Sequence, residues 1–121
     1  MSLSIEEKEV YVAFFQELYH NALSISVDDI TPEVAQMGDK MIDAIYQCSK
    51  QMIWAHALFA VFYGLPSFSV KSFLIKFGKA AVKNAKKWLD VLNKHRSYRT
   101  CVVAVANQYR TPLEMALNGL D

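Results

Sequence analysis

The sequence predicts an all-α fold, a single-domain helical bundle over residues 1–121 with four main helices and a short C-terminal helix. Apolar residues recur at steps of three and four through most of the chain, which is the period of one helical face. Capping-box and Thr-Pro patterns stand where these periodic segments begin. A chain of 121 residues, 53% of them hydrophobic, is long enough to bury one contiguous core.

The first helix is predicted to begin at Ser4, because Ser4 and Glu7 have the spacing of a capping box. Apolar residues at helical spacing then form one face: Tyr11, Phe14, Phe15, Leu18, Ala22 and Leu23. The periodicity fails near Ser24, so residues 24–30 are predicted to form a loop.

The second helix is predicted to open at Thr31-Pro32, since threonine can cap a helix and proline suits its first position. The apolar series continues to Tyr63, after which Gly64 and Pro66 end the helix. An unbroken helix of this length would measure about 48 Å. A domain of this size has a radius of gyration of only about 14 Å. We therefore expect a kink or break around Gly38–Asp39.

The third helix is predicted to start near Ser67 or Ser69 and to end at about His95. Three large apolar residues surround the junction before it: Tyr63, Leu65 and Phe68. They either close the end of the bundle core or form an apolar interface for a partner or a second copy. The apolar surplus of the second helix likewise makes a homo-oligomer plausible.

The fourth helix is predicted to follow a capping residue at Ser97. Residues 100–106 contain β-branched side chains that also suit a strand, but apolar residues around them keep helical spacing, which favours a helix. Thr111 and Glu114 repeat the capping-box spacing, with proline between them. They predict a separate short helix that ends at Gly119.

Charge is distributed unevenly along the chain, although the net charge is only +1. Residues 1–43 contain nine acidic and two basic side chains, which gives −7. Residues 44–113 contain eleven Lys or Arg and one acid, Asp90, which gives +10. A positive surface of this kind attracts anionic partners and binds them more weakly as salt rises.

The candidate binding residues lie on one face of the third helix and continue beyond its end. On a helical wheel, six lysines share an arc of about 100°. The predicted site comprises Lys76, Lys79, Lys83, Lys86, Lys87, Lys94, Arg96 and Arg99. The alternative is that these residues form only the solvated face of an amphipathic helix, or that the acidic first helix neutralises them.

These charges predict a small non-enzymatic binding protein, a regulator, adaptor or inhibitor that contacts an acidic protein surface. The alternative is binding to a nucleic-acid backbone without sequence specificity, because the lysine arc lacks the Arg, Asn or Gln residues that read base edges. A third hypothesis, weaker than both, is an apolar-ligand or haem carrier with its pocket near His56.

No catalytic residue, metal site or cofactor is expected. Glu17 and His20 have the spacing of a di-iron ligand pair, but they lie away from the apolar face and no second pair exists. His56 is expected to be a core or interface histidine. The sequence has no Gly-rich phosphate loop and no zinc-protease motif, and neither cysteine has a histidine at helical spacing.

Cys48 and Cys101 are predicted to be reduced core residues of a cytoplasmic protein. Both lie in apolar stretches without a metal-binding spacing, and no secretory signal is apparent at the N-terminus. A disulfide between them is the less favoured alternative. No membrane insertion is expected, because the uncharged segment 51–70 is interrupted at residues 64–66 and its apolar part spans only about a dozen residues.

Overall fold

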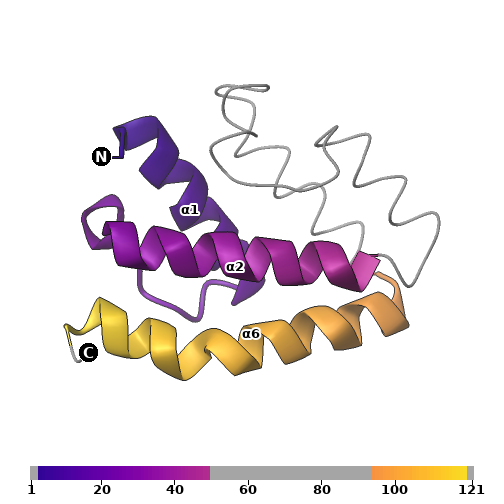
Figure 1. Ribbon diagram of the computed structural model, residues 1–121. Coiled ribbons are helices and arrows are strands. Elements are labelled where there is room, and N and C mark those ends of the chain that lie inside the picture. The colour runs from indigo at the N-terminus through magenta and orange to yellow at the C-terminus, as the bar shows by residue number, and fades with distance from the viewer. Residues whose placement is uncertain (1–2, 50–93, 120–121) are drawn as a thin grey trace.

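The computed structural model describes residues 3–49 and 94–119. Within these ranges the chain forms three α-helices, one 3-10 helix and no strand, which confirms an all-α class for this part (Figure 1). The helices are α1 (Ile5–Leu18), η1 (Val27–Asp29), α2 (Pro32–Ser49) and α6 (Arg96–Leu117). Most of the predicted third helix lies outside the described residues, so four main helices and a single domain stay predictions.

The helices α2 and α6 lie side by side and run in opposite directions, while α1 crosses over α2 (Figure 1). The core fills the space between these three helices and the segment that follows α1. The largest fully buried side chains come from all four segments: Tyr98, Phe14, Phe15, Ile30, Met41 and Ile45.

The helix α1 begins with the predicted capping box. The Ser4 hydroxyl accepts from the Glu7 N–H at 3.1 Å, and the Glu7 carboxylate accepts from the Ser4 N–H at 3.1 Å. The helix ends at Leu18, earlier than predicted, because His20 and Asn21 adopt positive φ angles of 52° and 61° that an α-helix cannot contain.

The segment after α1 seals one side of the core. Ala22, predicted to lie on the buried face of the first helix, is outside α1 and exposed, whereas Leu23 is also outside the helix but buried. The predicted loop 24–30 contains η1. The Asp29 carboxylate accepts from the Ser26 N–H at 2.8 Å, a short-range capping pattern that the apolar periodicity did not reveal.

The helix α2 begins as predicted, with the Thr31 hydroxyl accepting from the Val34 N–H at 3.2 Å. A kink or break was predicted at Gly38–Asp39, and the break is wrong, because α2 continues through both residues. Gly38 serves another purpose. A Cβ atom there would lie 2.8 Å from the Cδ1 atom of Tyr11 and 3.1 Å from the Cζ atom of Phe15. Glycine therefore allows α1 to cross close to α2.

The substitution Gly38→Ala is expected to destabilise the protein. Overpacking in a core typically lowers the free energy of unfolding by about 1–3 kcal/mol. Alanine recovers about 1 kcal/mol through its higher helix propensity. We expect a net loss of up to about 2 kcal/mol in urea denaturation. Gln36→Ala, at an exposed position of the same helix, is the control and should change stability by less than about 0.5 kcal/mol.

The helix α6 confirms that residues 100–106 are helical, but it differs from the prediction at both ends. It begins at Arg96 after His95, not after Ser97. The separate short C-terminal helix is wrong, because α6 continues through Pro112 to Leu117. Glu114 does not form the predicted capping box; its carboxylate instead accepts from the Arg110 Nε–H at 2.8 Å. The complete burial of Leu113 stabilises this continuous arrangement.

Candidate functional site

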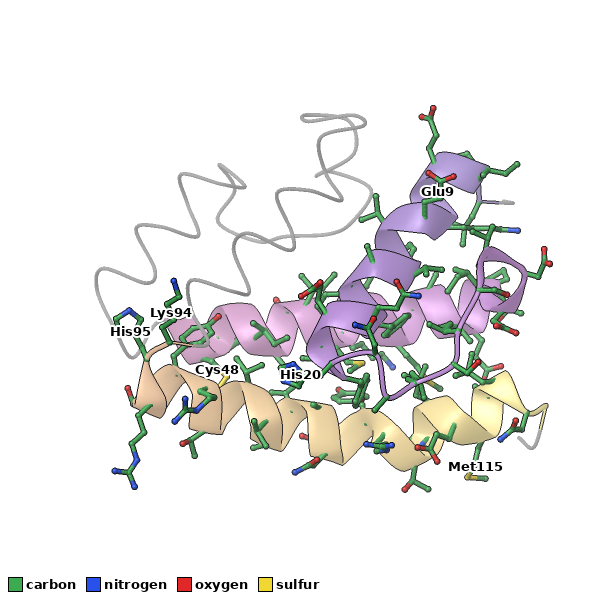
Figure 2. The ribbon with its side chains drawn as sticks, turned by 180° about the vertical axis from the view of Figure 1, so that it is seen from behind. Glu9, His20, Cys48, Lys94, His95 and Met115 are labelled. Carbon is green, nitrogen blue, oxygen red and sulfur yellow. A yellow bond between two sulfur atoms is a disulfide. The ribbon has the colours of Figure 1, made fainter. Side chains whose placement is uncertain are left out.

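The described part of the predicted basic site lies at the start of α6. Lys94, Arg96 and Arg99 are all exposed there. Figure 2 shows Lys94 and His95 at one end of the described structure and Glu9 at the other. The remaining candidates lie outside the described residues: Lys76, Lys79, Lys83, Lys86, Lys87, Tyr63, Leu65, Phe68 and His56.

The acidic side chains are placed where helices favour negative charge. The first turns of the other described helices contain acidic residues: Glu6 and Glu7 in α1, Asp28 and Asp29 in η1, and Glu33 in α2. The positive ends of the α1 and α2 dipoles stabilise Glu6, Glu7 and Glu33, and Asp29 accepts a capping hydrogen bond from the Ser26 N–H. The helix starts thus explain the positions of some of the acidic residues in the segment 1–43.

The basic side chains at the start of α6 lie where the helix dipole disfavours positive charge. The first turn of α6 contains no acidic residue, and Arg96 is its first residue, preceded by Lys94. Cations at a helix N-terminus are unfavourable by roughly 0.3–1 kcal/mol each. The stability of α6 therefore does not account for cations at these two positions.

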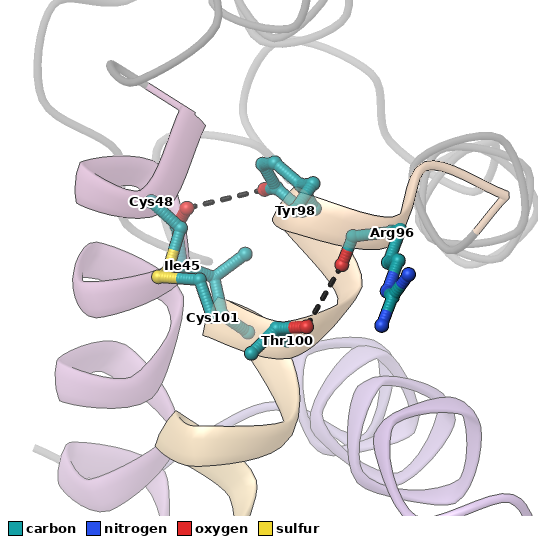
Figure 3. Close-up of a disulfide and its surroundings, with 6 residues drawn as sticks. All are labelled: Ile45, Cys48, Arg96, Tyr98, Thr100 and Cys101. Carbon is teal, nitrogen blue, oxygen red and sulfur yellow. Dashed lines mark hydrogen bonds between the residues drawn. A yellow bond between two sulfur atoms is a disulfide. The ribbon is translucent and has the colours of Figure 1, made fainter.

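The backbone at this end is fixed by two hydrogen bonds (Figure 3). The buried Tyr98 hydroxyl donates to the Ile45 carbonyl of α2 at 3.1 Å. The Thr100 hydroxyl donates to the Arg96 carbonyl at 2.9 Å. Burial raises the pKa of Tyr98 above its usual range, so this phenol remains a donor at any physiological pH. The Tyr98 hydrogen bond therefore ties the first turn of α6, which contains Arg96, to α2.

A disulfide joins the same two helices, which overturns the prediction that Cys48 and Cys101 are reduced. Their Cα atoms are 5.9 Å apart, although 53 positions separate them in sequence. Antiparallel packing of α2 on α6 brings Cys48 and Cys101 within bonding distance. The spacing of residues along the sequence does not predict such a pair. Disulfides persist mainly in oxidising compartments. A cytoplasmic location, which rested partly on reduced cysteines, stays an untested prediction.

The disulfide lies along an open groove between α2 and α6. The groove has a volume of about 470 Å³, and eight residues line it: Lys40, Asp43, Ala44, Gln47, Cys48, Cys101, Val105 and Tyr109. Cys101 is partly exposed, whereas Cys48 is buried. Sequence reasoning missed this feature, because a groove between two helices depends on their relative placement.

The other buried tyrosines tie segments together. The Tyr11 hydroxyl donates to Asp39 at 2.7 Å, and the Tyr19 hydroxyl donates to the Ala106 carbonyl at 2.7 Å. Burial raises the pKa of Tyr19 to about 12, although the positive charge of Arg110, 5.7 Å from the ring centre, opposes this shift. Each hydroxyl has a protein acceptor, so these contacts anchor α1 and its following segment.

The described residues contain no group of three His, Cys, Asp or Glu side chains placed to hold a metal ion. Glu17 is partly buried and His20 is exposed on the left-handed turn that ends α1. In residues 3–49 and 94–119, no helix is both long enough and apolar enough to cross a membrane.

Comparison with known proteins adds no relative. No protein-family model, no curated protein and no solved structure matches this chain.

Proposed function

We propose that the protein is a non-enzymatic binding protein, a regulator, adaptor or inhibitor, that contacts an acidic protein surface through its basic residues. The contact uses Lys94, Arg96 and Arg99 at the start of α6 together with the lysine arc predicted from the sequence. The observation that carries this proposal is the placement of Lys94 and Arg96 where they oppose the dipole of α6.

The start of α6 offers an anionic group two kinds of positive charge. Carboxylates are stabilised there by the helix dipole, and the side chains of Lys94 and Arg96 add full charges beside it. A guanidinium binds a carboxylate with two parallel hydrogen bonds, which gives Arg96 a geometric preference for Asp and Glu.

A salt series with two polyanions tests this function against its alternative. Immobilised poly-glutamate represents an acidic protein surface, and mixed-sequence duplex DNA represents a phosphate backbone. We expect the protein to be retained on poly-glutamate at about 50 mM salt and released as salt rises. Tighter retention on DNA, with a steep dependence on salt, would favour nucleic-acid binding. Failure to bind either polymer at about 50 mM salt would exclude both uses of the basic residues.

A further inference from the structure

We propose that the Cys48–Cys101 disulfide is a redox switch for the start of α6, and that its reduction weakens binding of the acidic partner. The inference rests on the proposed function, because the residues under control are its cationic contacts. The disulfide connects the last described turn of α2 to the second turn of α6 (Figure 3). Lys94, Arg96 and Arg99 all lie inside the covalent loop that it closes.

One sulfur of the disulfide belongs to a partly exposed residue. Cys101 is partly exposed and lines the open groove of about 470 Å³, whereas Cys48 is only 3% exposed. Disulfide exchange requires a thiolate to reach one sulfur directly. Lys40 and Asp43 line the groove with opposite charges, so no field of a single sign repels an approaching thiolate. The groove therefore gives access to the Cys101 side of the bond.

The reductant is a dithiol. One thiolate of the dithiol attacks the Cys101 sulfur, the bond between the two cysteines breaks, and the Cys48 sulfur leaves as a thiolate that takes up a proton. The second thiolate of the dithiol then attacks its own sulfur in the mixed disulfide and releases Cys101, which is protonated in turn. The dithiol becomes a cyclic disulfide, and the protein gains two electrons and two protons.

Reduction removes the covalent constraint nearest the cations. In the oxidised protein, the disulfide, the hydrogen bond from Tyr98 to Ile45 and the buried side chains of Tyr98 and Val102 all hold the start of α6. After reduction the hydrogen bond and the two buried side chains remain, so α6 stays packed in the core. Lys94 and Arg96 are exposed and precede Tyr98, so the added motion acts on these cations, and ordering them on binding costs free energy.

The test measures reduction and binding in the same protein. Dithiothreitol is added without denaturant, reduction is followed by mass spectrometry after thiol labelling, and affinity for poly-glutamate is measured before and after. We expect reduction of the native protein, retained helical circular dichroism, and affinity about fivefold or more weaker, recovering on reoxidation. Linkage requires that saturating poly-glutamate oppose reduction by the same factor. The variant Cys48→Ala plus Cys101→Ala should bind poly-glutamate with the affinity of the reduced protein, and dithiothreitol should not change that affinity.

Each other outcome overturns the switch in a distinct way. Equal affinity of the oxidised and reduced proteins would refute the switch and leave the proposed function intact. Reduction that occurs only in denaturant, or that abolishes the helical signal, would show a purely structural disulfide. An oxidised wild-type protein that does not bind poly-glutamate at all would refute the proposed function and the switch together.

Discussion

Replacing both cysteines, Cys48→Ala plus Cys101→Ala, is expected to lower the free energy of unfolding by about 4 kcal/mol. The disulfide closes a loop of 53 positions, and without it the unfolded chain regains the conformational entropy of that loop. Urea denaturation at equal protein concentration measures the difference. Small domains have total stabilities of about 5–15 kcal/mol, so the variant should remain folded at room temperature.

The reduced wild-type protein is the control for this double substitution. It lacks the covalent bond but keeps both cysteine side chains, so it separates the cross-link from the packing of the buried Cys48. We expect reduced wild type and the double variant to unfold at similar urea concentrations. If oxidised and reduced wild type unfold at the same concentration, the disulfide does not stabilise the folded protein.

The substitution Phe15→Ala is expected to lower the free energy of unfolding by about 3–5 kcal/mol. The Phe15 ring is fully buried, packs against Phe14 with ring centres 5.5 Å apart, and faces Gly38 where α1 crosses α2. Removing the ring takes away buried apolar area and leaves a cavity. Urea denaturation followed by circular dichroism measures the loss.

Val103→Ala is the matched control for Phe15→Ala, because Val103 is 47% exposed on α6. Its effect on stability should stay within about 0.5 kcal/mol. A change of less than about 1 kcal/mol for Phe15→Ala would contradict the assigned crossing of α1 on α2.

Local sequence signals predicted the starts of α1 and α2, but not the start of α6, and they wrongly placed a new helix at Thr111-Pro112. The capping box at Ser4 and the Thr-Pro pattern at Thr31 act through hydrogen bonds within one turn, so neighbouring residues indicated them. Ser4 and Thr31 accordingly cap the helices that follow them. The helical spacing around residues 100–106 also outweighed their β-branched composition, because burial of one face decides such segments.

Features that depend on packing between helices were not predictable in this way. Gly38 was expected to kink or break the second helix, but α2 continues through it and its missing Cβ makes room for Tyr11 and Phe15 of another helix. Pro112 was expected to start a new helix, but the burial of Leu113 and the pairing of Glu114 with Arg110 accompany a continuous α6. A sequence pattern contains no information on such distant partners.

The charges of the candidate site were predictable from the sequence, but its position on a helix and its covalent bond to another helix were not. The sequence located Lys94, Arg96 and Arg99 as cations, and the structure places these three on the surface. That Lys94 and Arg96 oppose a helix dipole depended on knowing that α6 begins at Arg96. The disulfide between Cys101 and Cys48 forms because α2 packs against α6, and no spacing within the sequence indicated that packing.

The most direct test of the proposed function is the affinity for poly-glutamate of Lys94→Glu plus Arg96→Glu, compared with Lys8→Glu plus Lys40→Glu. Both variants change the net charge equally, but the control residues belong to α1 and α2. Acidic residues at the start of α6 suit its dipole, so the first variant should be at least as stable as wild type. We predict about tenfold weaker binding for the first variant and a much smaller loss for the control. Equal losses in the two variants would contradict a specific role for the start of α6.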